Sequence, residues 1–374
     1  MRLHLCNSVP FVADQFDCCK CRAVGERGKR DTMNSRFCRW LIVSALIITA
    51  SGARAQQSAP PASDQKSIIT DEQLAASGNA LAQLHLGFLY YKGQGVPQDY
   101  TQAAVWWRRA AEQGDAVAQL SLGLLYDGGI GVPQDDSQAA LWYRKAADQG
   151  NAPAMTRIGN LYREGQGVPQ DFAEAAIWYR KAAEQGNAPA MTMIGNLYRE
   201  GQGVSQDLTQ AAIWYRKAAD LGDADAQIHL GWLYKQGQGV PQDYAQATLW
   251  YRKAADQGNV DAQSELGWLY EHGQGVPQDY TQAVFWYRKV AYQGDVDAQS
   301  HLGLLYEKGR GVPRDFAEAY FWLDLAAAGQ KDDSNSKEVA KERDEAASHL
   351  TPADLSREQE LARKWYEERK AKTQ

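Results

Sequence analysis

The sequence predicts an all-α solenoid, a stack of helix pairs without a central core. A unit of 36 residues occurs seven times without insertion between Gly78 and Gly329. Each unit holds two stretches of helical periodicity, joined by a glycine-rich loop. A tryptophan holds the same place in every copy: Trp106, Trp142, Trp178, Trp214, Trp250, Trp286 and Trp322. Units of this length cannot bury their apolar faces alone, so they stack on their neighbours.

The first helix of the unit is clearest in the fifth copy, where the pattern predicts it over Ala224–Gln236. Small or apolar residues at Ala226, Leu230 and Leu233 fall on one of its faces. Gly231 recurs in all seven copies, although glycine inside a helix costs about 1 kcal/mol relative to alanine. We therefore expect a close helix crossing at Gly231, where a Cβ atom would clash.

A short loop reverses the chain and starts the second helix. Gly237 is expected to end the first helix in the left-handed conformation, and Asp243 to cap the N-terminus of the second. The second helix should bury Tyr244, Ala247, Trp250, Tyr251 and Ala255. Two-residue Gly-Asp or Gly-Asn links should then place the next unit antiparallel on this one.

Residues 33–55 have the pattern of a signal peptide. Arg36 and Arg39 form a basic start, Leu41–Ala50 is apolar, and the segment ends in Ala-Arg-Ala at Ala55. The apolar run is shorter than the roughly 20 residues that span a bilayer. We predict export to the periplasm or the medium, with cleavage after Ala55, and no integral membrane segment.

Other segments flank the repeats. Signal peptides begin at their initiator methionine, so we interpret residues 1–32 as an over-extended gene model. Residues 56–77 are interpreted as a flexible linker and a short lead-in helix. The repeats then occupy residues 78–329, and residues 330–374 form a C-terminal helical cap.

The seventh copy departs from the others at its end. Its second helix reads Trp-Leu-Asp-Leu at Trp322–Leu325, where most other copies read Trp-Tyr-Arg-Lys. A polar loop and two further helices should follow, over residues 337–349 and 352–371, with Thr351 as an N-cap before Pro352. The open end of a solenoid needs such a cap. We expect it to be sealed by Leu355, Leu361, Ala362 and Trp365.

Charge and cysteine content exclude several classes of protein. The net charge is −6, and residues 1–55 hold nine basic against four acidic residues, so the remainder carries −11. An acidic chain is a poor match for nucleic acid or an anionic membrane surface. All five cysteines lie before residue 56, which removes disulfides, thiolate metal sites and cysteine nucleophiles from the repeats.

No motif indicates catalysis. Ser63-x-x-Lys66 and Ser334-x-x-Lys337 match the serine acylase pattern, but the S-D-N and K-T-G motifs that accompany it are absent. The loops repeat G-x-G without the third glycine or the preceding strand of a phosphate-binding fingerprint. We therefore expect no enzymatic activity, no cofactor and no metal.

The repeat resembles the Sel-one-like repeat, a relative of the tetratricopeptide repeat. The resemblance rests on A-x-A-Q-x-x-L-G-x-L-Y at Ala224–Tyr234, on the G-x-G-V-P-Q-D loop, and on A-x-x-W-Y-R-K-A-A of the second helix. It covers all seven copies and implies a right-handed α-solenoid that serves as an adaptor in protein complexes; many bacterial members are exported. A cysteine-rich branch is linked to penicillin binding and β-lactam hydrolysis, but this chain lacks those cysteines.

The first helix varies between copies mainly on one stripe. In the fifth copy the stripe holds Asp225, Ile228, His229, Trp232, Lys235 and Gln236, a spacing that places them on one helix face. The resemblance implies that this stripe faces a concave groove, where a protein or peptide would bind. The predicted site comprises Phe88, His229, Trp232, Gln236, Glu265, Trp268, His272 and His301. Trp232 and Trp268, equivalent in adjacent copies, either anchor a partner or pack between helices.

Histidines are frequent on the same stripe, at His85, His229, His272 and His301. Zinc needs its ligand nitrogens about 2 Å away, whereas packed helices lie about 8–10 Å apart. Adaptable polar contacts are therefore favoured over a metal site.

Two classes of function remain. The favoured class is an exported, non-catalytic scaffold for protein–protein interaction. The alternative, by family association, is a cell-wall-active or β-lactam-processing protein, which nitrocefin turnover by the pure protein would reveal. The sequence does not identify the partner.

Overall fold

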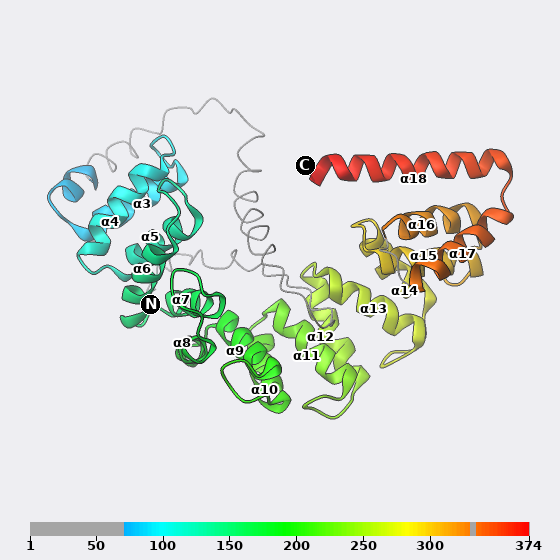
Figure 1. The fold of residues 1–374 in the computed structure, drawn as a ribbon, viewed down its shortest axis with the longest axis horizontal. Helices are drawn as coiled ribbons and strands as arrows, with labels where there is room; N and C mark the ends of the chain where they lie inside the picture. Colours follow the sequence, from blue (N-terminus) through cyan, green and yellow to red (C-terminus); the bar gives the residue numbers. More distant parts are fainter. Residues whose placement is uncertain (1–70, 330–333, 374) are drawn as a thin grey trace, which may run out of the picture. The chain divides into compact units, whose positions relative to one another are not determined.

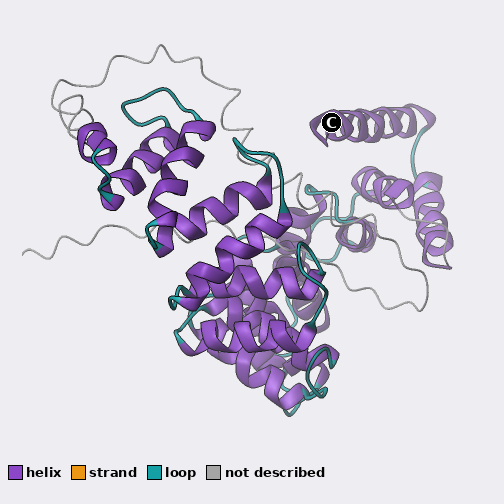
Figure 2. Ribbon diagram, turned by 60° about the vertical axis from the view of Figure 1, so that its left-hand side comes forward, coloured by secondary structure: helices purple, strands orange, loops and turns teal. Residues whose placement is uncertain are grey.

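The computed structural model describes residues 71–329 and 334–373. Residues 1–32, the expected signal peptide at residues 33–55 and most of the linker lie outside this part of the chain. Within it, all regular secondary structure is α-helical (Figure 2). The chain divides into two compact units, the first ending at Pro189 and the second beginning at Ala190.

The first unit holds three helix pairs, preceded by a helical segment at residues 71–76 (Figure 1). These helices are α3 (Ala80–Lys92), α4 (Tyr100–Glu112), α5 (Ala116–Gly128), α6 (Asp136–Asp148), α7 (Ala152–Glu164) and α8 (Phe172–Glu184). The two helices of each pair pack together, and α4 and α6 also pack on the first helix of the following pair.

The second unit begins in the first turn of α9. Its helices are α9 (Ala188–Glu200), α10 (Leu208–Asp220), α11 (Ala224–Gln236), α12 (Tyr244–Asp256), α13 (Val260–His272), α14 (Tyr280–Ala291), α15 (Val296–Lys308), α16 (Phe316–Gly329), α17 (Ser334–Ser348) and α18 (Pro352–Thr373). Each second helix from α10 to α14 packs on the following first helix. The predicted α-solenoid of 36-residue helix pairs is confirmed, and α11 has the predicted bounds.

The loop between the two helices follows the predicted chemistry. Gly237 ends α11 with a φ of 67°, and the Asp243 carboxylate accepts two backbone N–H hydrogen bonds in the first turn of α12. Gly239 also has a positive φ, of 71°. A Cβ atom on Gly239 would lie 2.2 Å from the carbonyl oxygen of Leu208 in the preceding repeat. The second loop glycine is therefore required because the loop packs against the start of the preceding second helix.

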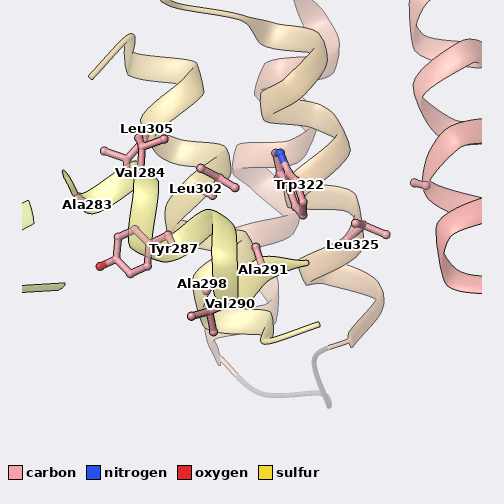
Figure 3. Packing of buried hydrophobic residues seen from close by; sticks show 11 residues of the cluster. Ala283, Val284, Tyr287, Val290, Ala291, Ala298, Leu302, Leu305, Trp322 and Leu325 are labelled. Carbon is pink, nitrogen blue, oxygen red and sulfur yellow. The ribbon is translucent and has the colours of Figure 1, made fainter. Parts of the chain in front are cut away.

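The core of each repeat lies between its two helices and the next pair. In Figure 3, Tyr287 and Val284 of α14 meet Leu302 of α15 and Trp322 of α16 in one buried cluster. The predicted burial of Ala247, Trp250, Tyr251 and Ala255 is confirmed. Tyr244 is only half-buried, because it is the first residue of α12 and its hydroxyl accepts a hydrogen bond from Gln242 at the surface.

The C-terminal cap consists of α17 and α18, both packed on α16. Helix α17 begins at Ser334, earlier than the predicted start at residue 337. The Thr351 hydroxyl accepts from the backbone N–H of Asp354, as expected of an N-cap. Ala362 is buried in the cluster that contains Trp322 and Trp365. Leu361 is 45% exposed, so its predicted role in sealing the end is wrong: it follows Glu360 on the solvent side of α18.

Candidate functional site

Five of the seven second helices lay a tyrosine ring across the glycine of the paired first helix, while Trp107 takes this place in the first copy and Leu323 in the last. A Cβ atom on Gly231 would lie 2.8 Å from Cε1 of Tyr251, which confirms the predicted close crossing. The tyrosine hydroxyl then reaches a residue of the first helix. In four copies it donates to that residue: Tyr143 to Asp127 at 3.2 Å, Tyr179 to Asn160 at 2.6 Å, Tyr215 to Asn196 at 2.6 Å, and Tyr287 to Glu271 at 2.9 Å.

Successive first helices of the second unit are joined by charged side chains. Lys235 of α11 donates to Glu265 of α13 at 2.6 Å, and Glu271 of α13 pairs with His301 of α15 at 3.0 Å. The two pairs occupy equivalent positions of successive repeats, because Glu271 lies 36 residues after Lys235 and His301 lies 36 residues after Glu265. We call this surface the first-helix face. It comprises Asp225, Ile228, His229, Trp232, Lys235, Gln236, Glu265, Trp268, Glu271, His272 and His301.

Trp268 lies at the centre of this face and is held from several sides. It is half-buried and packs against two hydrophobic clusters of the second unit. The Lys235 ammonium lies 4.2 Å from its ring centroid, and the His272 ring stacks on it at 4.5 Å with an interplanar angle of 25°. His272 Nδ1 is 2.9 Å from the Trp268 carbonyl oxygen, which fixes the histidine in place. Trp268 therefore both packs and presents part of its surface.

Trp232 occupies the equivalent position in the fifth copy but is less constrained. Its side chain is half-buried, and it makes no stacked or cation–π contact within residues 71–329 and 334–373. Gln236, one turn further along α11, is exposed. The face thus combines two half-buried indoles with polar side chains, one of which, Gln236, is exposed.

His229 is a packing residue rather than a free contact. Its ring lies 4.9 Å from that of Tyr215 and is only partly accessible. Burial, together with the nearby positive charge of Arg199, lowers the pKa of His229 to about 3. The imidazole is therefore neutral at physiological pH and offers no charge to a partner.

His301 belongs to a partly buried polar cluster at the next repeat. Its ring stacks on Tyr287 at 4.9 Å and 10°, while Glu271 accepts from the Tyr287 hydroxyl. Two opposing effects act on the Glu271 carboxyl: burial alone would raise its pKa, but the hydrogen bond from His301 and the charges around it leave the pKa lowered. This group ties α13, α14 and α15 together.

Phe88 belongs to the first unit. Its ring makes an edge contact with Trp107 of the same repeat at 5.1 Å and 72°, and His85 on the same helix is paired with Asp71 at 2.7 Å. Among the predicted site residues, the structure brings Trp268 and His272 into direct contact. The structure adds Lys235, which contacts both Glu265 and Trp268. The sequence signal for this residue is the opposite charge of Glu265, 30 residues further along the chain.

The described residues offer no arrangement for metal chemistry: within 71–329 and 334–373, no three His, Cys, Asp or Glu side chains converge on one point. No helix in the same ranges is long and apolar enough to cross a membrane. The first-helix face is a surface of half-buried aromatic side chains and paired polar groups.

Comparison with known proteins agrees with this geometry. The profile of the Sel1 repeat family matches residues 80–115, 116–151, 152–187, 188–223, 224–259, 260–295, 296–330 and 347–368. No curated protein sequence matched the chain.

Solved structures of similar proteins include a Sel1 repeat protein from Oxalobacter formigenes, which is 32% identical with a TM-score of 0.62. The match covers 86% of this chain and 97% of that one. A second is c5321, a protective antigen of uropathogenic Escherichia coli with an SLR fold, at 30% identity and a TM-score of 0.48, covering 79% of this chain and 86% of that one. Because the family profile matches every one of the 36-residue units and continues into the cap, the chain belongs to the Sel1 repeat family.

Proposed function

We propose that this protein is an exported scaffold that binds an extended segment of a partner protein on the first-helix face of its second unit. Sel1 repeat proteins are in general scaffolds for protein–protein interaction. We place the binding site on the part of this face between α11 and α13 because of the residues that lie there.

The observation that carries the proposal is the neighbourhood of Trp232 and Trp268. Both indoles are half-exposed on the same face of adjacent repeats, and they are surrounded by Lys235, Glu265 and His272. Aromatic anchors inside a polar rim dominate the affinity of most interfaces, and truncation of one anchor costs about 2 kcal/mol or more.

Truncation of each indole tests the proposal. Tagged wild-type protein and the Trp232→Ala variant are used to capture proteins from an envelope extract, and retained proteins are compared by mass spectrometry. Because Trp232 is half-buried and makes no stacked or cation–π contact in the described part of the chain, its loss should abolish capture of the specific partner while the melting temperature falls little. Phe285→Ala, which removes an aromatic side chain 49% exposed on α14 outside this face, is the matched control and should retain the partner.

Trp268→Ala should also weaken capture, but with a larger loss of stability, because Trp268 packs against two clusters. Equal capture by wild-type protein and both tryptophan variants would contradict the proposal.

Export is the second part of the proposal and rests on the leader pattern ending at Ala55. The native protein should be recovered from the periplasm or the medium with Gln56 as its N-terminal residue. Intact-mass analysis measures this directly. Native protein that retains Met33, or that is confined to the cytoplasm, would contradict export without affecting the binding proposal.

A further inference from the structure

The hydroxyl of Tyr251 is exceptional among the tyrosines that cross the first helices. It is buried and has no hydrogen-bond partner among the residues that the structure describes, and Tyr251 as a whole is 1% exposed. Most buried polar groups in proteins are paired, so one without a partner calls for an explanation.

Comparison of the repeats shows why this hydroxyl is unpaired. In other copies the partner comes from one of two positions on the first helix. Asn160 and Asn196 occupy the first position, and Asp127 and Glu271 the second. In the fifth copy these positions hold Trp232, which has no acceptor, and Lys235, whose ammonium is engaged by Glu265. The unpaired hydroxyl therefore belongs to the repeat whose first helix contributes Trp232 and Lys235 to the proposed site.

We propose that the Tyr251 hydroxyl donates a hydrogen bond to a main-chain carbonyl of the bound segment. This inference rests on the proposed function and specifies how the segment is held. Burial and the negative charge of Glu265 raise the pKa of Tyr251, so the phenol keeps its proton and acts as a donor.

The spacing of the face suits an extended backbone. The Lys235–Glu265 ion pair brings α11 and α13 within reach of one bound segment, and an extended chain rises about 3.3 Å per residue with alternate side chains on one side. Two side chains of the segment that are two or three residues apart can therefore contact Trp232 and Trp268. The carbonyl groups between them then lie above the fifth-copy tyrosine.

Lys235 is the side chain that must move to admit this carbonyl. It occupies the position whose equivalents in other copies touch the tyrosine hydroxyl, and it is held by Glu265 and the Trp268 ring. Ion pairs near the surface contribute little to stability, so displacement of Lys235 is an inexpensive step. The segment thereby gains a hydrogen bond that does not depend on its sequence.

The first arm of the test is stability. Tyr251→Phe removes the unpaired hydroxyl and should leave the melting temperature of the full chain unchanged. Tyr215→Phe, the matched control, removes a hydroxyl that donates to Asn196 at 2.6 Å and should lower it. If Tyr251→Phe lowers the melting temperature as much as Tyr215→Phe, the hydroxyl has a partner within the protein and the inference is wrong.

The second arm is binding. Peptides are selected on the wild-type chain from a random dodecapeptide library displayed on phage, and their dissociation constants are measured by fluorescence anisotropy. Tyr251→Phe should weaken all Trp232-dependent peptides about fivefold to tenfold, the effect of one lost hydrogen bond, whatever their sequence. Unchanged affinities, or losses confined to peptides sharing one polar side chain, would overturn the main-chain assignment. Unchanged affinities in Trp232→Ala would instead overturn the proposed function.

Discussion

Gly267 lies directly beneath the ring of Tyr287, so that a Cβ atom on this glycine would be 2.6 Å from Cε1 of the tyrosine. No real Cβ atom tolerates that distance, and the rigid ring is buried and cannot turn aside. Overpacking of a buried site typically costs about 1–3 kcal/mol, which here outweighs the gain of about 1 kcal/mol from replacing glycine inside a helix. Gly267→Ala should therefore lower the free energy of unfolding, measured by urea denaturation.

Gly303→Ala is the matched control for this prediction. In the seventh copy the tyrosine is replaced by Leu323, and the nearest atom to an added Cβ is Leu323 Cγ at 2.7 Å. A leucine can adopt another rotamer, so Gly303→Ala should cost less than Gly267→Ala. Equal losses for the two variants would show that the ring is not the obstacle.

Within the described part of the chain, the indole N–H of the tryptophan in the second helix has a partner in some repeats and none in others. Trp178 and Trp322 donate their indole N–H to a glutamate four residues earlier, Glu174 at 3.1 Å and Glu318 at 3.0 Å. Trp286 is 4% exposed and its Nε1 has no partner among the described residues; Gln282 stands at the corresponding position, and its amide oxygen does not accept from the indole.

Gln282→Glu should place a charged acceptor in reach of the indole, as Glu174 and Glu318 do in their copies, and stabilise the protein by about 1 kcal/mol, the typical net value of a hydrogen bond. The rise in melting temperature is the measurement. Gln210→Glu places the same charge at the same point of α10, where Trp214 is half-exposed and reaches water. It therefore reports only the effect of a carboxylate near a helix N-terminus, and a gain as large as that of Gln282→Glu would refute the indole explanation.

Acid sensitivity is expected from His229. An unfolded chain binds a proton at this residue near a pKa of about 6.5, whereas burial and Arg199 lower the pKa in the folded protein to about 3. Between these values the unfolded state holds more protons, so stability falls as the pH drops.

Lowering the pH from 7 to 5 should cost about 1–2 kcal/mol through this residue. His229→Gln removes the titrating group and should flatten the loss relative to wild-type protein, as measured by urea denaturation at each pH. Parallel pH profiles for the two proteins would mean that the folded protein binds the proton as readily as the unfolded chain.

The sequence is sufficient to predict features that depend on neighbouring residues in the chain. The cap at Asp243, the left-handed Gly237 and the tight crossing at Gly231 follow from local rules, and all three are present. The 36-residue period then determines which helices must pack, and with it the fold.

Features that depend on how successive repeats face each other could not be predicted in this way. The contact of Lys235 with Glu265 and Trp268 joins two helices across 30 residues, and it needs the register of the stack. The same register leaves the Tyr251 hydroxyl unpaired. His229 looked like a surface contact on the variable stripe, but its position against Tyr215 makes it part of the packing.

The seventh copy has an acidic residue at a position where the other copies have arginine, and this residue pairs with the C-terminal cap. In most copies an arginine two residues after the tryptophan donates to a tyrosine of the next first helix, as Arg288 does to Tyr306 and Arg216 to Tyr234. Asp324 stands at this position in the last copy and faces Arg343 of α17, with 3.6 Å between the guanidinium and the carboxylate.

Asp324→Arg should therefore loosen the cap by setting two arginines against each other. Asp324 is only half-buried, so the loss of the pair and the new repulsion together should cost about 1–2 kcal/mol. In the double variant Asp324→Arg/Arg343→Asp the opposite charges face each other again and much of the loss should return. A double-mutant cycle measured by urea denaturation separates this coupling from the effects of each single change. Additive losses in the double variant would show that α17 is held on α16 by its apolar contacts, chiefly Val339 and Ala346 with Tyr320 and Leu323, and that the inverted charge contributes nothing to the cap.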